Sequence, residues 1–428
     1  MAEGQTHPEP GTKRLLTLRR AGCLLGLGVF ALAVLAVFYD PAPDLPPLVL
    51  PPVPVPNALD TFSAAANEIK AKDRLPATSS DYHKWTAAER WKNVREGLGE
   101  NQKALALIEA GLRQPFGYSL NDLDLERGLR KVSRIKDSAK LLIAVAEFER
   151  LRGEPDASLQ TSVKILQIGL RAKNDGSNIT RMIAAAIEAM GRHSAWQVAD
   201  SAGKEAALDA ARKLDQEFAS VESFARHLER SRELEVREIV RETSKPNWRL
   251  EFVRQVVQAD GLLAAPSALF DNRRRAIRQY RANVDSWVRK AKAPFKHRNP
   301  PPTTPSSPLA RSWASHVEAM WFADVRAEAQ VKLLMLALAL RAYRLEHGRF
   351  PNRLTVLTPE YLSRIPADPF NDGPDFHYLN KGSSYLLYSI GPDGKDDGGT
   401  PIVDRSPAKP LYIVRFDSRG DIVAGVNK

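Results

Sequence analysis

The segment Ala21–Tyr39 constrains this 428-residue chain most, because it contains no charged side chain. As a helix rising ~1.5 Å per residue it would be about 28 Å long, close to the hydrocarbon thickness of a bilayer. Four Lys and Arg residues precede it, whereas residues 40–57 contain neither. Under the positive-inside rule, this asymmetry predicts a basic cytoplasmic tail over residues 1–20, a transmembrane helix over residues 21–39, and all later residues outside the cytoplasm.

Other interpretations of the segment stay open at this level. A cleaved signal peptide would have an apolar run of only about 7–15 residues and a small-residue cleavage site, which the bulky Phe38 and Tyr39 do not provide. Arg19-Arg20 is a weak match to a twin-arginine signal, and lipidation of Cys23 is disfavoured because the apolar run follows the cysteine. We therefore expect an uncleaved anchor in membrane lipid, with the bulk of the chain on the periplasmic side of a bacterial inner membrane.

Two proline-rich segments divide the chain after the anchor. Residues 40–57 contain eight prolines, and residues 299–309 contain five. Proline favours the extended left-handed helix, so the first segment predicts a spacer of up to roughly 50 Å. The expected domains are accordingly a helical domain over residues 58–298 and a C-terminal domain over residues 310–428.

The region between the two linkers shows the apolar spacing of amphipathic helices almost throughout. One apolar stripe consists of Leu141, Leu142, Val145, Phe148 and Leu151. Gly153 and Pro155 end this helix, and two more helices are expected around a turn at residues 174–176. Antiparallel helices with short polar turns are typical of helical hairpins in solenoid proteins, although no fixed-period repeat is present. The sequence thus predicts a mainly α protein, with strands only after about residue 375.

Positive charge is concentrated just before the second linker. Residues 271–298 contain ten Lys and Arg but two Asp, a net charge of +8 out of +11 for the whole chain. Tyr280, Trp287 and Phe295 are interleaved with these residues, and such a composition can bind nucleic acid through phosphates and base stacking. Because we expect the segment outside the cytoplasm, a solvated helical face or contact with an anionic surface is favoured over nucleic acid.

The C-terminal domain has the most specific order of motifs. A helix ends at Gly348, Pro366-Ala367-Asp368-Pro369 forms a turn, and the strand Tyr385–Ile390 leads into an acidic, glycine-rich loop over residues 391–399. This order resembles the globular head of the major pseudopilin of type II secretion. The resemblance covers residues 338–399 and implies a small α+β domain with antiparallel strands. The peptidase site and the glutamate of that family are absent from the N-terminal segment.

The acidic loop is the candidate ligand site. Asp393, Asp396 and Asp397 supply the hard oxygen ligands that calcium prefers, and glycines allow the tight turns that direct carbonyl oxygens inward. The resemblance implies a later acidic ligand, for which Asp404 is the nearest candidate. The alternative is a series of Asp-Gly turns between two strands, without a metal ion.

The sequence of this domain also predicts how its strands and its long helix pack. Strands are expected at residues 376–379, 385–390, 411–416 and 421–424, with the last two joined as a hairpin. A long helix from about residue 310 to residue 347 should pack against this sheet through Ala329, Leu333, Leu336, Leu340 and Tyr343, which recur at helical spacing.

Sequence motifs for catalysis are absent. No nucleophile elbow, P-loop, dinucleotide-binding glycine motif or zinc-ligand spacing occurs. We therefore expect a non-enzymatic structural or interaction protein that binds other envelope proteins, with type II secretion or envelope assembly as the context that the resemblance implies. The alternative is a hydrolase of an envelope polymer whose site forms only in three dimensions. An acid-lined cleft with shifted carboxylate pKa values would favour that alternative.

Overall fold

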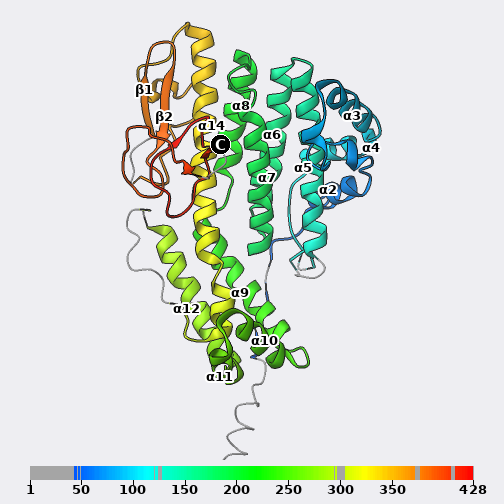
Figure 1. The fold of residues 1–428 in the computed structure, drawn as a ribbon, viewed down its shortest axis with the longest axis vertical. Helices are drawn as coiled ribbons and strands as arrows, with labels where there is room; N and C mark the ends of the chain where they lie inside the picture. Colours follow the sequence, from blue (N-terminus) through cyan, green and yellow to red (C-terminus); the bar gives the residue numbers. More distant parts are fainter. Residues whose placement is uncertain are drawn as a thin grey trace, which may run out of the picture. The chain divides into compact units, whose positions relative to one another are not determined.

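The computed structural model describes residues 43–45, 47–48, 50–119, 121–123, 128–293, 295, 304–371, 376–405 and 410–427. The predicted tail and transmembrane helix lie outside these residues, so the anchor stays a prediction. Within the described part of the chain, no helix is both long and apolar enough to cross a bilayer. The protein is mainly α-helical with a small antiparallel sheet near its C-terminus, as the sequence predicts (Figure 1).

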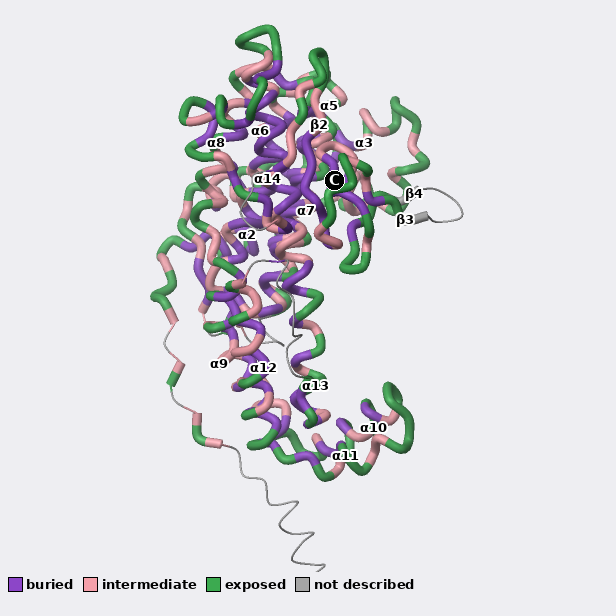
Figure 2. Tube along the Cα trace, turned by 90° about the vertical axis from the view of Figure 1, so that its left-hand side faces the viewer, coloured by how far each residue is buried: buried purple, intermediate pink, exposed green. Residues whose placement is uncertain are grey.

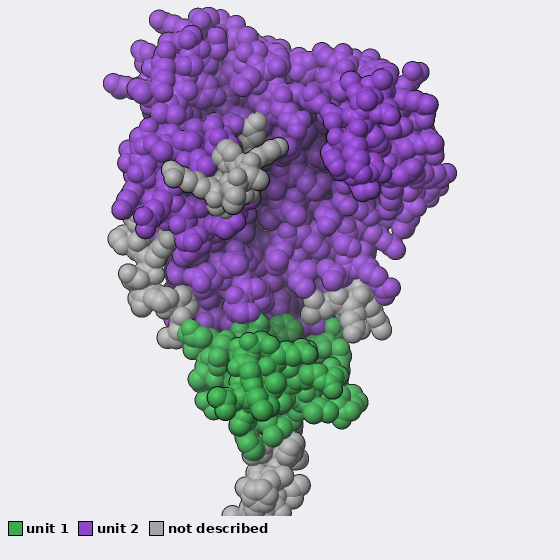
Figure 3. All heavy atoms as spheres, viewed as in Figure 1, with its two compact units in different colours: residues 1–46, 239–281, 304–313 green, residues 47–238, 282–303, 314–428 purple. Residues whose placement is uncertain are grey.

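The chain forms two compact units, which are coloured separately in Figure 3. The small unit contains Ile239–Arg281 and Thr304–Trp313, besides residues 1–46. The large unit contains Pro47–Glu238, Ala282–Thr303 and Ala314–Lys428. These boundaries differ from those expected from the proline-rich segments, because most of the helical region and the C-terminal region belong to one unit.

The N-terminal part of the large unit is a succession of helices. They are α2 (Ala58–Asn67), α3 (Ala87–Gly99), α4 (Gln102–Leu112), α5 (Gly128–Leu151), α6 (Pro155–Ala172), α7 (Asn178–Trp196) and α8 (Lys204–Ala219), with the 3-10 turns η1 (Lys72–Arg74) and η2 (Tyr82–Lys84). Pro155 lies in the first turn of α6, where its missing N–H costs nothing, and Ser177 caps α7 by accepting a hydrogen bond from the Thr180 nitrogen. The apolar stripe of α6 is buried.

Two glycines set the close approach of α6 and α7. A methyl group on Gly169 would lie 2.7 Å from the backbone nitrogen of Glu188, and one on Gly191 would lie 2.7 Å from the backbone nitrogen of Leu166. Both distances are shorter than van der Waals contact, so any side chain here would force the helices apart. The glycines therefore bring the two backbones together beside Glu188.

Helix α14 (Val317–His347) lies at the centre of the large unit. It contacts α7 and α8 on one side, and β2 and η4 (Leu354–Leu357) on another (Figure 1). All residues from Leu333 to Leu340 are buried, which is the pattern of a helix covered on every side. The predicted long helix is therefore present but starts at Val317. It packs against α7 and α8 as well as against the sheet.

The sheet differs in its pairing from the one expected. Strands β1 (His377–Asn380), β2 (Tyr385–Ser389) and β5 (Ile422–Val423) form an antiparallel sheet in the order β1-β2-β5, and β3 (Asp404–Arg405) pairs with β4 (Pro410–Leu411). The predicted hairpin between residues 411–416 and 421–424 is wrong, because Ile422 pairs with Ser389. Burial explains the difference: Ile422 is fully buried, whereas Tyr412 and Ile413 are exposed.

The small unit is built around a buried carboxylate. It contains the end of α9 (Phe224–Thr243), α10 (Trp248–Asp260), η3 (Leu262–Ala264), α11 (Ala265–Leu269), the start of α12 (Arg273–Lys292) and most of α13 (Pro308–Ala314). Asp271 accepts hydrogen bonds from the Ser307 hydroxyl at 2.7 Å and from the Leu309 nitrogen at 2.8 Å. Asp271 thereby joins the two segments of the unit.

Candidate binding cleft

The predicted calcium ligands lie in and after the loop that follows β2. Asp393 accepts a hydrogen bond from the Lys395 nitrogen at 3.2 Å, and Asp396 accepts one from the Gly398 nitrogen at 2.9 Å. Asp397 is exposed, and Asp404 belongs to β3 rather than to the loop. In the described ranges, no group of three His, Cys, Asp or Glu side chains is arranged to hold a metal ion. Calcium binding stays a prediction.

Two buried aspartates hold this loop and the preceding turn in place. Asp421 accepts a hydrogen bond from the Gly399 nitrogen at 2.7 Å. Asp368, from the predicted turn, accepts hydrogen bonds from the Ser389 hydroxyl at 2.8 Å and the Ile390 nitrogen at 3.2 Å. Burial raises the pKa of both carboxyl groups. The turn is thus bonded to the end of β2, next to the start of the acidic loop.

The aromatic residues of the basic segment belong to the protein core. Tyr280, Trp287 and Phe295 are each at most 5% exposed. Arg274 and Arg278 of the same helix are exposed. Base stacking requires accessible rings, so this arrangement offers no aromatic surface for single-stranded nucleic acid.

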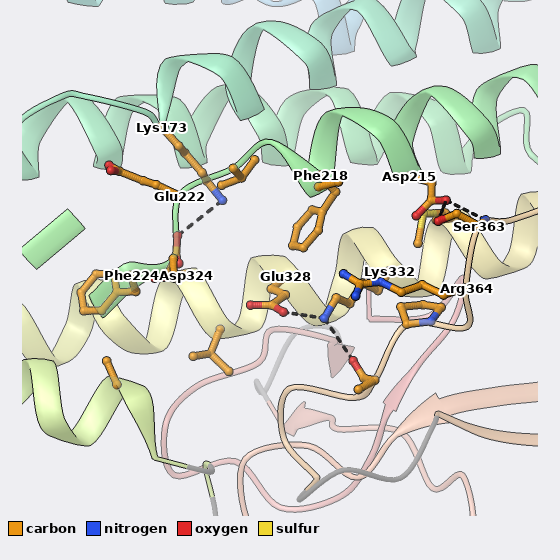
Figure 4. Close-up of a pocket in the computed structure, with 18 of the residues that line it drawn as sticks. Lys173, Asp215, Phe218, Glu222, Phe224, Asp324, Glu328, Lys332, Ser363 and Arg364 are labelled. Carbon is orange, nitrogen blue, oxygen red and sulfur yellow. Dashed lines mark hydrogen bonds and ion pairs between the residues drawn. The ribbon is translucent and has the colours of Figure 1, made fainter. Parts of the chain in front are cut away.

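A cleft of about 850 Å³ lies in the large unit (Figure 4). Its walls come from the C-terminal end of α6, from α7, from the α8–α9 connection, from α14 and from the turn at residues 363–367. Helix α14 contributes Trp321, Asp324, Val325, Glu328, Lys332 and Met335. These residues recur at three- and four-residue spacing, so they share one face of the helix. The cleft therefore joins segments that are distant in the sequence.

A buried ion-pair network forms the inner end of the cleft. The Arg181 guanidinium donates from Nε to Oδ1 of Asp324 at 3.2 Å and from Nη2 to Oδ2 at 2.9 Å. The Lys173 ammonium lies 3.5 Å from the same carboxylate and also pairs with Glu188 (Figure 4 shows the contact with Asp324). Arg192 pairs with Glu188 at 3.4 Å and donates to the Gln330 side chain at 2.9 Å. Two anions thus bind three cations.

The network holds the Asp324 carboxylate ionised. Burial alone would raise the pKa of Asp324, but the charges of Arg181 and Lys173 outweigh it and lower this pKa to about 2. Burial likewise opposes ionisation of Lys173, yet Glu188 and Asp324 raise its pKa above the ordinary value. Local structure places these groups: Arg181 and Glu188 are seven residues apart, two turns along α7. Lys173 caps the end of α6, where a cation is favoured by the helix dipole.

A second set of polar residues extends the network along α9. Glu222 pairs with Arg230 and lies 3.3 Å from Nδ1 of His227. The other ring nitrogen of His227 lies 3.0 Å from the side-chain oxygen of Asn178. Burial is the main cause that lowers the pKa of His227, to about 4, while the pKa of Glu222 is lowered because bonding to His227 and Arg230 outweighs burial. At neutral pH the ring is uncharged and the carboxylate is ionised.

The mouth of the cleft carries a cation without a partner. Lys332 pairs with Glu328, donates to the Ala367 carbonyl at 3.1 Å and lies 5.4 Å from the centre of the Phe218 ring. Asp215 accepts from the Ser363 hydroxyl at 2.6 Å. Arg364 is exposed and makes no hydrogen bond or ion pair with any residue that the structure describes. In Figure 4 its side chain extends from the turn into the cleft.

The arrangement suits binding better than proton transfer. Asp324 and Glu222 have lowered pKa values, so neither carries a proton at neutral pH. The paired charges are fixed in position, Trp321 and Met335 supply apolar surface, and Arg364 can bind an anionic group. The sequence analysis missed this site. Its signal is present, however, because Asp324, Glu328 and Lys332 recur at four-residue spacing on α14, just before the apolar segment Leu333–Leu340.

No protein-family model matches this chain, and no solved structure matches it.

Proposed function

We propose that the protein is a single-pass, membrane-anchored interaction protein of the extracytoplasmic side, and that its cleft binds a segment of another envelope protein. One observation carries the proposal: among the described charged side chains that line the cleft, every one except Arg364 has a hydrogen-bond or ion-pair partner within the large unit. Charged side chains held by such contacts, with one available cation among them, form a recognition surface.

The chemistry of the cleft defines the segment that it would bind. Arg364 presents a planar guanidinium, which binds a carboxylate with two parallel hydrogen bonds. Phe218 and Trp321 also line the cleft, and they favour an apolar or aromatic side chain on the bound segment. We therefore infer a partner segment that contains an acidic residue and an apolar one.

The C-terminal region supports a pseudopilin-like identity for part of the large unit. The Pro-Ala-Asp-Pro turn is bonded through Asp368 to the end of β2, and the glycine-rich loop follows directly. In contrast to a free-standing head, the region shares α14 with α7 and α8. We propose that the motif order serves a secretion-related or envelope-assembly role within this larger unit.

The cleft is lined by carboxylates with shifted pKa values, as the hydrolase alternative requires, but the pKa values of Glu222 and Asp324 are lowered, whereas a general acid needs a raised one. Glu235 does have a pKa raised to about 7, chiefly by burial, but it does not line the cleft. Glutamate with such a pKa is a typical general acid when it faces substrate. Its position on α9 among buried groups favours the interaction protein.

Site-specific photo-crosslinking in intact membranes tests the proposed function. A photoreactive amino acid at position 219, where Ala219 is exposed and lines the cleft, should give a light-dependent adduct with a specific protein. The adduct should be lost in an Arg364→Glu variant and retained in an Arg353→Glu variant. Arg353 is a matched control because it is also an exposed arginine with no side-chain partner among the described residues. Equal loss in the two variants, or no adduct at position 219, would refute a binding cleft.

Topology is tested separately. A reporter that is active only outside the cytoplasm, fused after Lys428, should be active, and the protein should remain in the membrane fraction after carbonate extraction. An inactive reporter would place the chain on the other side and overturn the localisation.

A further inference from the structure

The small unit exposes a run of large apolar side chains. Leu263 is 98% exposed, Leu262 is 77% exposed and Phe270 is 59% exposed. These residues belong to the connection between α10 and α12, residues 261–270, which contains no charged residue. Figure 2 shows that the chain is exposed where it leaves α10. Clustered exposure of this kind marks an interaction site in a folded protein.

This apolar loop stands on an ordered base. Arg249 is 9% exposed and donates to the Leu269 carbonyl at 3.2 Å and to the Asp271 carbonyl at 2.7 Å. Phe252 and Ala268 are buried beneath the loop, in helices that contact each other. The base therefore fixes the loop while its leucines project outward into solvent.

The exposed surface around the loop is basic. Within residues 244–280, the exposed charged side chains are five Lys or Arg and two Asp or Glu, a net charge of +3. Arg254, Arg274 and Arg278 make no hydrogen bond or ion pair with any described residue. Arg274 and Arg278 are four residues apart on α12 and so lie on the same face. Unpaired arginines and exposed leucines in one small unit match the two parts of an anionic phospholipid, its headgroup and its acyl chains.

We propose that the apolar loop, residues 261–270, inserts into the outer leaflet of the bilayer, and that Arg254, Arg274 and Arg278 bind anionic phospholipid headgroups. Interfacial segments bury their apolar side chains about 5–10 Å into the boundary between headgroups and acyl chains. The proposal gives the basic segment of the sequence a specific partner. It rests on the proposed anchor, which holds the chain at a bilayer.

Lipid explains the surface better than a protein partner does. The large exposed side chains of the loop are Leu262, Leu263 and Phe270, which partition into acyl chains. Basic residues near an anionic leaflet are attracted to its headgroups. A second contact with the same membrane also costs little further freedom, because the anchor already restricts the chain.

The test measures depth of insertion in the full-length protein. Cys23→Ala removes the native thiol, and Leu263→Cys or Val356→Cys then carries an environment-sensitive fluorophore. Val356 is the matched control, because it is 47% exposed and belongs to the large unit. The protein is reconstituted into phosphatidylcholine vesicles with about a third phosphatidylglycerol. Phospholipids with a nitroxide on the acyl chain should quench the probe at position 263 several-fold more than the probe at position 356.

Further variants separate the components of the proposal. Arg274→Glu with Arg278→Glu should reduce quenching at position 263 several-fold in anionic vesicles and have little effect in pure phosphatidylcholine. Circular dichroism confirms that each variant is folded. Equal quenching at positions 263 and 356 overturns the insertion, and a signal that follows protein concentration rather than nitroxide content assigns the loop to self-association instead. Flotation of the vesicles with bound protein reports the anchor independently, so that failure of the anchor and failure of the loop are distinguishable.

Discussion

Replacement of Glu188 by Gln should destabilise the large unit strongly. Glu188 is fully buried and pairs with Lys173 and Arg192, whose side chains are 3% and 6% exposed. Gln preserves the shape of the side chain but removes its charge. Lys173 would keep the Asp324 carboxylate at 3.5 Å, and Arg192 would keep its bond to Gln330. In the variant, Lys173 and Arg192 therefore remain buried with less negative charge near them.

The expected loss is about 3–4 kcal/mol at pH 7. Removal of one member of a buried pair typically costs about 3–5 kcal/mol. An upper limit for the part due to Lys173 comes from its deprotonation: about 3.4 units between pH 7 and the ordinary lysine pKa, at 1.36 kcal/mol per unit, give roughly 4.6 kcal/mol. The remaining contact with Asp324 reduces this value.

The sign of the pH dependence follows from Lys173. In the native protein Glu188 and Asp324 overcome burial and raise the pKa of Lys173, so the pair contributes stability throughout the range below the ordinary lysine pKa. In the variant, burial lowers this pKa in the folded state. The loss of stability should therefore shrink as pH rises from neutral toward the ordinary pKa of lysine, because the unfolded state loses its advantage in binding the proton.

Urea denaturation followed by far-ultraviolet circular dichroism measures the effect. The double variant Lys173→Met, Glu188→Gln should lose less than the sum of the two single variants, by about 1–3 kcal/mol, as interacting residues do. Glu205→Gln is the control, because this side chain is 85% exposed and its replacement should leave the midpoint unchanged. A loss below about 1 kcal/mol for Glu188→Gln, or a loss independent of pH, would refute the assigned role of the network.

Three further predictions concern other positions. Gly191→Ala should lower the free energy of unfolding by about 2 kcal/mol or more, because its methyl group would lie 2.7 Å from the Leu166 nitrogen. Gly99→Ala is the control: no atom lies within 4 Å of its methyl group, so it should be neutral or stabilising, and equal melting temperatures for the two variants would contradict the close approach of α6 and α7. Burial lowers the pKa of His227 to about 4, so the stability that the uncharged ring contributes should be fully present above about pH 6.5 and lost as pH falls toward 4. His227→Gln should flatten this part of the curve of melting temperature against pH, and an unchanged slope would exclude His227 as the cause. If the loop binds calcium, as the resemblance implies, the melting temperature should be higher in calcium than in chelator. At free calcium a hundred times Kd the stabilisation should be about 2.7 kcal/mol, and Asp396→Asn should remove it. No difference in melting temperature would leave the loop as a series of turns.

Local features of the sequence determined the secondary structure. The end of α5 before Gly153, the end of α14 before Gly348 and the strand from Tyr385 were all predicted, because caps and apolar spacing act over three or four residues. The same reasoning predicted that strands would follow residue 375, and β1 is the first strand in the described part of the chain. The turn at Asp368 was predicted from its two prolines alone.

Only the tertiary structure decided which of these elements pack together. The apolar residues of α14 predicted a buried face, but they did not show whether this face packs against the sheet or against the preceding helices. In the structure α14 contacts α7 and α8 as well as β2, so the helical region and the C-terminal region form one unit. The cleft has the same origin. Arg181 and Asp324 are 143 residues apart, and neither residue alone differs from an ordinary surface charge. Charge pairing over such a separation depends on the packing of α7 against α14, which no local pattern of residues specifies.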